Sequence, residues 1–185
     1  MFISFTNFLP FYIIFLLIGT IERITSTFIH KKIKPTKYIY QKWTFFVPFY
    51  TYLLILFFSM GECLLTVNVI NVAISVLGFV FFFVGVLLRR KTIADLGRNW
   101  SVYIEIKENH ELISNGIFTF LKHPYCLAVL FELIGICLIG NTFYSLILVF
   151  SIQIPLLIIR IILEERVLIS YFGDTYRRYK SNKIL

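Results

Sequence analysis

Five long apolar segments limit what this 185-residue chain can fold into more than any other feature of its sequence. They run near Phe2–Ile21, Trp43–Met60, Val69–Leu88, Pro124–Ile139 and Thr142–Leu163. A helix needs about 20 mostly apolar residues to cross the hydrocarbon core of a bilayer. The segment 124–139 is short for a full crossing, so we expect it to be tilted or to end inside the protein. The sequence predicts an all-α, polytopic helical membrane protein with about five transmembrane helices.

The composition supports a lipid environment. Hydrophobic residues make up 58% of the chain and the mean hydropathy is +0.83, whereas soluble domains are nearer half apolar. The 21 Phe and 11 Tyr residues suit helices packed in a bilayer with aromatic anchors at its surfaces. The first apolar segment lacks a basic stretch before it and a small-residue cleavage site, so we expect a retained helix rather than a signal peptide.

The 18 Lys and Arg residues fall into three groups, of which the first follows the first span, the second follows the third span and the third closes the chain. The groups are Arg23, Lys31, Lys32, Lys34, Lys37 and Lys42; then Arg89, Arg90, Lys91, Arg98, Lys107 and Lys122; and then Arg160, Arg166, Arg177, Arg178, Lys180 and Lys183. The connection after the second span carries only Glu62, and the connection after the fourth carries no charge. Because basic connections stay in the cytoplasm, we expect the N-terminus outside and the C-terminus in the cytoplasm. The net charge of +8 then reflects topology, and no nucleic-acid partner is expected.

This pattern predicts one membrane-embedded domain with four parts. They are the three N-terminal spans (1–88), a polar cytoplasmic connector (89–123), a helical hairpin (124–163) and a cytoplasmic tail (164–185). The cysteines Cys63, Cys126 and Cys137 form no CxxC pair. The last two would lie roughly 16 Å apart on one helix, at 1.5 Å per residue, which is too far for a disulfide. We interpret all three as small buried hydrophobic residues, and no metal site is indicated.

Two polar stretches in the connector are candidates for function. In Leu96-Gly97-Arg98-Asn99-Trp100-Ser101, the glycine is expected to end a helix and the tryptophan to anchor the chain at lipid headgroups. The second stretch is His110-Glu111-Leu112-Ile113-Ser114-Asn115-Gly116-Ile117-Phe118. Its Asn-Gly pair predicts a tight turn. The stretch is either an ordinary loop or a segment that presents backbone groups to a ligand.

A third stretch, Lys122-His123-Pro124-Tyr125-Cys126, precedes and begins the fourth helix. Pro124 is expected at the first helical position, where its missing N–H costs little. The positive end of the helix disfavours protonation of His123 and favours anions. The stretch is either a cap at the membrane surface or a ligand site in which a neutral His123 forms a hydrogen bond.

The remaining charged candidates lie on the last two spans. Arg160 and Glu164 share a helix face, and Glu165 follows. Arg before Glu is the weaker order for an intrahelical pair, and acids near a helix C-terminus oppose its dipole. A ligand that uses both charges explains them better than helix stability does. Glu132, inside the fourth span, is expected either to pair with a buried donor or to line a polar cavity.

Together these stretches resemble the isoprenylcysteine carboxyl methyltransferase family, which is related to the membrane phospholipid methyltransferases. The resemblance covers roughly the last half of the chain. It rests on Leu96-Gly97 with Trp100, on His110 to Ile113 with Gly116 and Phe118, on Lys122-His123-Pro124, on Arg160 with Glu164-Glu165, and on Phe172-Gly173 with Tyr176 and Tyr179. No single motif is specific, but five in register are.

The resemblance implies a helical membrane bundle with a cytoplasmic C-terminal catalytic region. It implies S-adenosyl-L-methionine as cofactor and a lipophilic methyl acceptor that enters from the bilayer lipid. The implied cofactor-binding residues are His110, Glu111, Leu112, Ile113, Phe118, His123, Pro124, Tyr125, Cys126 and Glu164. Arg160 would bind the acceptor, so that Arg160 and Glu164 form the catalytic pair. Lys122, Phe118 and Cys126 depart from the family's usual Arg, Tyr and Tyr.

The acceptor is left open between three classes. O-methylation of a carboxylate, as on a C-terminal prenylated cysteine, is what the resemblance implies by default. A carboxylate is already a nucleophile, so it needs a cation to position it and exclusion of water. A lipid amine or the hydroxyl of a lipophilic metabolite would also need a base, for which Glu165, His123 and Glu132 are the candidates. A membrane protein that retains the fold without catalysis is the remaining alternative.

Overall fold

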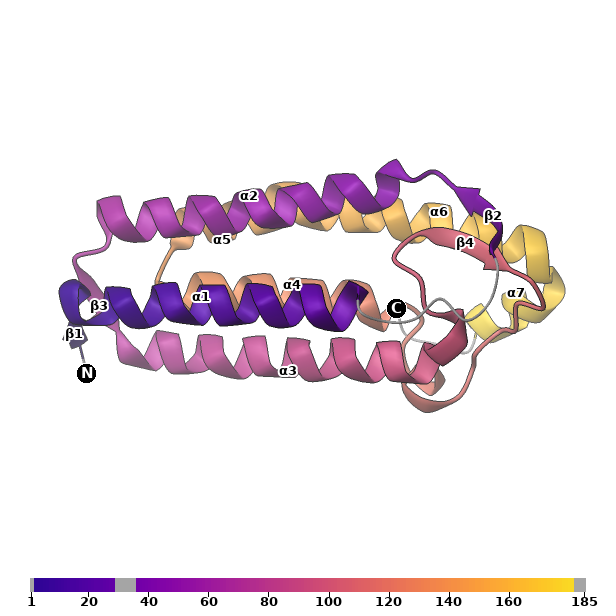
Figure 1. Cartoon of the computed structure of the whole chain (residues 1–185), viewed down its shortest axis with the longest axis horizontal. Helices are drawn as coiled ribbons and strands as arrows, with labels where there is room; N and C mark the ends of the chain where they lie inside the picture. The colour runs from indigo at the N-terminus through magenta and orange to yellow at the C-terminus, as the bar shows by residue number, and fades with distance from the viewer. Residues whose placement is uncertain (1, 29–35, 182–185) are drawn as a thin grey trace.

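The computed structural model describes residues 2–28 and 36–181, and it is a bundle of helices that run along one long axis (Figure 1). The helices are α1 (Phe5–Phe28), α2 (Trp43–Thr66), α3 (Val72–Leu96), α4 (Pro124–Ile139), α5 (Phe143–Leu148), α6 (Ile154–Phe172) and α7 (Asp174–Ser181). A π-helical stretch, Val149–Gln153, joins α5 to α6 without a break. The basic residues Lys31, Lys32, Lys34 and Lys183 lie outside the described residues. Because the bundle is made of helices, several of them long and apolar enough to cross a membrane, the fold class is confirmed as an all-α polytopic membrane protein.

Four helices are long and apolar enough to cross a membrane: Phe5–Phe28, Trp43–Thr66, Val72–Asn99 and Phe143–Phe172. The helix α4 is shorter, as the sequence predicted, at 16 residues. It lies beside α3 and is the most enclosed of the apolar helices, with buried residues on all sides. A buried helix needs no lipid-facing length, which explains why this segment is short and, apart from Glu132, apolar on all sides.

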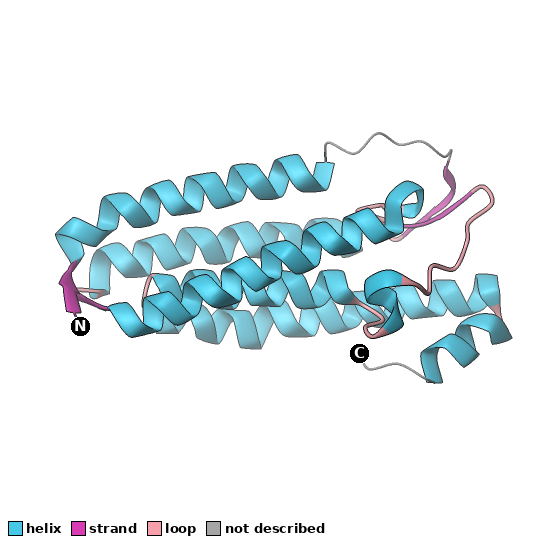
Figure 2. Ribbon diagram, turned by 90° about the horizontal axis from the view of Figure 1, so that it is seen from below, coloured by secondary structure: helices cyan, strands magenta, loops and turns pink. Residues whose placement is uncertain are grey.

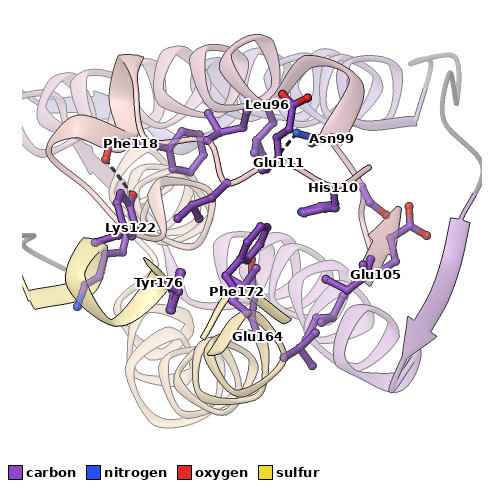
Figure 3. Close-up of a pocket in the computed structure, with 18 of the residues that line it drawn as sticks. Leu96, Asn99, Glu105, His110, Glu111, Phe118, Lys122, Glu164, Phe172 and Tyr176 are labelled. Carbon is purple, nitrogen blue, oxygen red and sulfur yellow. Dashed lines mark hydrogen bonds between the residues drawn. The ribbon is translucent and has the colours of Figure 1, made fainter. Parts of the chain in front are cut away.

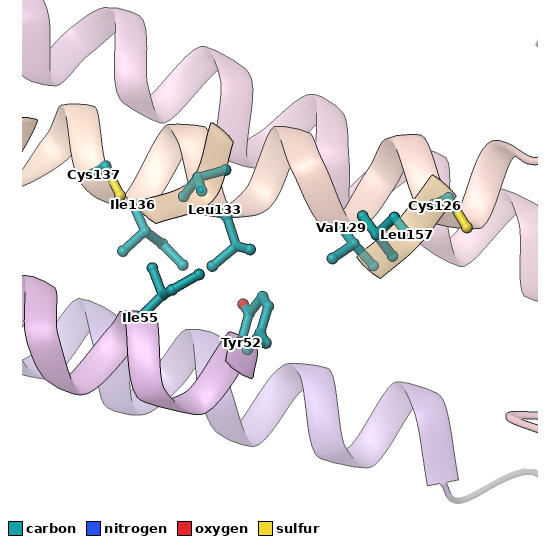
Figure 4. Packing of buried hydrophobic residues seen from close by; sticks show 9 residues of the cluster. Tyr52, Ile55, Cys126, Val129, Leu133, Ile136, Cys137 and Leu157 are labelled. Atoms are coloured by element: carbon teal, nitrogen blue, oxygen red, sulfur yellow. The ribbon is translucent and has the colours of Figure 1, made fainter. Parts of the chain in front are cut away.

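Glycines allow α3 and α4 to approach closely. A Cβ atom at Gly135 of α4 would lie 2.5 Å from the backbone nitrogen of Phe82, and one at Gly78 of α3 would lie 2.6 Å from that of Ile139. Small residues at such positions let two helix backbones pack in direct contact, which is how helices associate in lipid. On its other side α4 contacts α2 and α6 through a cluster that includes Tyr52, Leu133 and Leu157 (Figure 4).

Two short antiparallel strand pairs close the opposite ends of the bundle, and the sequence did not predict them. At one end β1 (Phe2–Ser4) pairs with β3 (Val69–Asn71). At the other end β2 (Thr36–Tyr40) pairs with β4 (Ile104–Lys107), so the connector after α1 is joined to the connector after α3 (Figure 1). This second pair helps to form the polar end of the molecule, which also contains the 3₁₀ turns Gly97–Asn99 and Gly116–Thr119 together with α7 (Figure 2).

Helices α1 and α2 end at Phe28 and Thr66 rather than at Ile21 and Met60, and two other helices continue still further beyond their predicted ends. Helix α3 reaches Leu96 rather than Leu88, and α6 reaches Phe172 rather than Leu163. Glu164 and Glu165 therefore lie inside a helix, so the expectation that they oppose the dipole at a helix C-terminus is wrong. The sequence missed these extensions because hydropathy marks where a helix leaves the apolar region, whereas the helix itself ends at a glycine, Gly97 or Gly173.

Charges at the polar end of the bundle form a buried network rather than solvated loops. Glu132 of α4 accepts hydrogen bonds from Arg23 of α1 and from Nε of Arg89 of α3, the latter at 2.7 Å. Arg89 also binds Glu22 of α1 and is fully buried. Of the two expectations for Glu132, the structure shows pairing with buried donors. The assignment of Arg23 and Arg89 to connecting segments was wrong, because their helices extend past the apolar residues.

The orientation in the membrane remains a prediction, and it has a direct test. Single cysteines at Asn68 and Ser181, in a chain whose buried free cysteines Cys63, Cys126 and Cys137 have been replaced, should react from opposite sides of the membrane. The position near Ser181 should be reached only from the cytoplasm, because the basic groups lie near that end. Labelling of intact and opened cells with an impermeant maleimide measures this. Labelling of both positions from one side would contradict the predicted topology.

Candidate active site

A cavity of about 120 Å³ lies at the polar end of the bundle, among α3, β4, α6, α7 and the segment between β4 and α4 (Figure 3). Predicted cofactor residues contribute much of its lining, namely His110, Glu111, Leu112, Ile113, Phe118 and Glu164. Asp95 holds the turn that precedes Phe118. Its Oδ2 accepts a hydrogen bond from the backbone N–H of Ile117 at 2.8 Å. Gly116 has a φ of +58°, and a Cβ there would lie 2.2 Å from Asp95 Oδ2, so only glycine fits this turn.

A second cavity, of about 60 Å³, adjoins the first. Its lining includes the remaining predicted residues, which are His123, Pro124, Tyr125, Cys126 and Arg160. Glu164 and Phe118 line both cavities, so the two cavities lie on either side of these side chains. Pro124 is the first residue of α4, as predicted. The structure thus brings every predicted site residue to two adjoining cavities, although His110 and Glu164 lie 54 positions apart in the chain.

Arg160 lies between the polar cavities and the apolar part of the bundle. It also lines a third cavity, of about 30 Å³, whose walls include Phe45, Phe49 and Leu157. Its side chain is held by carbonyl oxygens: Nη1 donates to Thr44 and Nη2 donates to Val102, each at 2.9 Å. Arg160 therefore faces the proposed cofactor region on one side and aromatic residues of α2 on the other.

The sequence of α2 explains why a carbonyl is available to Arg160. Pro48 carries no N–H to meet the carbonyl of Thr44 four residues earlier, so this oxygen has no partner in the helical ladder. The guanidinium supplies one. Arg160 is only 8% exposed, and no ion pair within residues 2–28 and 36–181 involves it. The simple intrahelical pair with Glu164 is therefore absent, and a buried cation is left without a carboxylate.

His123 lies between the two acids of α6. Its Nδ1 is 3.9 Å from Glu164 Oε2, and its Nε2 is 3.4 Å from Glu165 Oε1. Glu165 also accepts from Lys180 of α7 at 2.6 Å. Glu164, by contrast, is about one-third exposed and lines the cavities, so its carboxylate is open to a ligand. Of the two acids, Glu165 is held by protein groups and Glu164 is the one that can bind a second molecule.

Helix α7 covers the larger cavity with aromatic side chains. Tyr179 donates from its hydroxyl to the carbonyl of Phe118 at 2.9 Å, and Lys180 binds Glu165. Tyr176 lines the cavity with Phe172, and burial raises the pKa of Tyr176 well above its usual value, so its phenol stays neutral. The helix therefore closes the cavity with rings that suit a planar ligand.

Several lining residues were not assigned to the site from sequence. They include Leu96, Asn99, Ser101, Tyr103, Glu105, Lys122, Phe172, Tyr176 and Tyr179. The family resemblance includes Phe172, Tyr176 and Tyr179, so the sequence could have indicated that these three residues belong to the site. Tyr103 and Glu105 gave no signal, because their position depends on the pairing of β4 with β2.

Trp100 contacts protein groups at the polar end of the bundle. Its indole N–H donates to the carbonyl of Thr27 at 3.3 Å, and its ring lies 5.0 Å from that of Tyr125. It lines the second cavity. The indole therefore has a hydrogen-bond partner at the end of α1, and the role of Trp100 as an anchor at lipid headgroups stays a prediction.

The fold and this region define a polytopic helical membrane protein with a polar site at one end of its bundle. The family model described as the isoprenylcysteine carboxyl methyltransferase family matches residues 76–170, just over half of the chain. The chain therefore belongs to the isoprenylcysteine carboxyl methyltransferase family. The matched region begins in α3 and ends in α6, so it contains most of the residues that line the two polar cavities, whereas Phe172 and helix α7 lie beyond it.

Two curated relatives are similar to part of this chain. Protein-S-isoprenylcysteine O-methyltransferase of Schizosaccharomyces pombe is 30% identical over 108 residues, which is 57% of this chain and 45% of that protein. The protein of the same name from Xenopus laevis is 29% identical over 117 residues, which is 58% of this chain and 38% of that protein. The similarity thus spans less than half the length of either relative.

Proposed function

We propose that this protein is an integral membrane methyltransferase that uses S-adenosylmethionine and methylates a carboxylate of a lipophilic acceptor, such as a C-terminal prenylated cysteine. Membership of the family and the names of its relatives support this assignment. The observation that carries this proposal is the burial and hydrogen bonding of the Arg160 side chain. A buried guanidinium that binds only carbonyl oxygens has a strong preference for an anion. A carboxylate acceptor supplies that anion.

The residues of the larger cavity fit the proposed cofactor. Rings of Phe118, Phe172 and Tyr176 suit the adenine, and the carboxylate of Glu164 suits a cationic group. S-adenosylmethionine supplies a methyl group on a sulfonium, which is transferred by in-line displacement. We assign cofactor binding to residues 110–113, Phe118, 123–126 and Glu164.

The acceptor would approach through the aromatic side of the bundle. Arg160 holds its carboxylate near the junction of the cavities and orients it for attack. The apolar lining of the third cavity, with Phe45, Phe49 and Leu157, excludes water from the reacting groups. A carboxylate oxygen attacks directly, so no proton has to be removed.

The ion pairs made by the candidate bases favour a carboxylate acceptor over a hydroxyl or an amine. Glu132 is bound by two arginines, and Glu165 by Lys180. A carboxylate that already carries a cationic partner is a poor base. Only His123 of the three candidates then remains, and a carboxylate acceptor needs none of them.

Removing the side chain of His123 or Glu164 should weaken binding of S-adenosylhomocysteine. We expect His123→Ala and Glu164→Ala each to cost about 1–3 kcal/mol, the usual loss for a buried polar partner. Calorimetry on the detergent-purified protein measures the affinity. Arg166→Ala is the matched control, because Arg166 is exposed on the same helix. Unchanged affinity in both variants, with the fold intact, would remove the support for this cofactor site.

A further inference from the structure

Asn99 is fixed at the edge of the larger cavity by the end of α3. Gly97, with a φ of +47°, ends the helix, and the following 3₁₀ turn, Gly97–Asn99, is closed by a bond from the N–H of Trp100 to the carbonyl of Gly97 at 3.1 Å. Asn99 is only 9% exposed, and it lines the cavity beside Glu111 (Figure 3). Its side chain is thus a buried amide in the wall of the proposed cofactor site.

The hydrogen bonding of this amide leaves one atom to account for. Nδ2 donates to the carbonyl oxygen of Glu111 at 3.3 Å. A carbonyl oxygen can only accept, so this contact fixes which end of the amide is nitrogen. The other end, Oδ1, is buried and has no hydrogen-bond partner among the residues that the structure describes. Buried acceptors in folded proteins are nearly always satisfied, because an unpaired one is costly.

We propose that Oδ1 of Asn99 accepts a hydrogen bond from the bound cofactor, which makes Asn99 a binding and specificity residue. This inference rests on the proposed function. The group that meets it must be an N–H or O–H donor, and S-adenosylmethionine offers three: the adenine amino group, the ribose hydroxyls and the α-ammonium. A site built around such a bond rejects an analogue that lacks the donor, because the acceptor is then left unpaired.

The test combines one substitution with a set of ligands. Binding of S-adenosylhomocysteine is compared in the wild-type protein, in Asn99→Ala and in Asn99→Asp, which keeps an acceptor oxygen. Three analogues follow, each without one of these donor groups: S-inosylhomocysteine, a dideoxyribose derivative that lacks both hydroxyls, and a derivative without the α-amino group. Asn7→Ala is the control, since Asn7 is exposed on α1 at the other end of the bundle.

Asn99→Ala should weaken binding of S-adenosylhomocysteine by about tenfold to a hundredfold, and Asn99→Asp should bind it more tightly than Asn99→Ala does. For the analogue that lacks the partner donor, the wild type and Asn99→Ala should bind equally. Unchanged affinity in Asn99→Ala, or the same loss for all four ligands, would overturn the inference. Failure of the wild type to bind S-adenosylhomocysteine would instead overturn the proposed function.

Discussion

Replacing Arg160 by alanine is expected to lower kcat/KM for methyl transfer by roughly a hundredfold to a thousandfold, while affinity for S-adenosylhomocysteine changes far less. The loss corresponds to one charged hydrogen-bond donor in a dry site. Arg160→Lys should recover only part of the rate, because an ammonium lacks the planar fork that binds Thr44, Val102 and an acceptor together. The assay is methyl transfer to a panel of lipophilic acids, alcohols and amines, with cofactor binding measured for each variant.

Two comparisons separate the acceptor role of Arg160 from a structural one. Arg160→Gln keeps an N–H donor for a carbonyl but removes the charge, so it should fold normally and still lose turnover. Arg166→Ala, on the exposed face of α6, should behave like the wild type. Equal losses of cofactor binding and turnover in Arg160→Ala would assign Arg160 to the cofactor site. Full activity of Arg160→Ala on lipophilic acids would remove the main support for a carboxylate acceptor.

Replacing Glu132 by alanine is expected to have the largest effect on stability, about 3–5 kcal/mol of unfolding free energy. Such a loss is usual when one member of a buried ion pair is removed. Glu132 is 1% exposed and binds both Arg23 and Arg89, so the variant leaves two buried cations without this carboxylate. The change should appear as reduced thermal stability in detergent and as a shifted denaturation midpoint in mixed micelles.

The controls for Glu132 test whether charge or shape is responsible. Glu132→Gln keeps the volume and an acceptor oxygen, so an intermediate loss is expected. Glu108→Ala removes an exposed carboxylate between β4 and the 3₁₀ turn Gly116–Thr119 and should change stability by no more than about 0.5 kcal/mol. Wild-type stability in Glu132→Ala would show that the network Arg23–Glu132–Arg89 does not hold α1, α3 and α4 together.

Much of the site could be predicted because its residues occur in short runs. The run His110 to Ile113 and the run His123 to Cys126 were assigned from the resemblance to the family, and they do line adjoining cavities. Arg160 and Glu164 lie one helical turn apart, so their common face followed from helical spacing. Their chemical roles are proposals that the predicted variants test.

Other features of the site could not be predicted from short runs of residues. Asn99 was visible in the sequence, but only the contact of its Nδ2 with Glu111 shows that Oδ1 is the atom left for a ligand. The position of Thr44 against Arg160 joins residues 116 positions apart. Pairings between distant segments depend on how helices pack, and no local pattern encodes them.

The sequence by itself determined the all-α membrane class, because the apolar residues greatly outnumber those that a soluble fold of this size can bury. It also determined the short fourth helix and its start at Pro124, since a proline at the first turn and an apolar run have local causes. Only the tertiary structure decided which charges are solvated. Arg23, Arg89 and Glu132 lie far apart in the chain, and they become an ion network because α1, α3 and α4 converge at one depth, where each buried charge requires a partner.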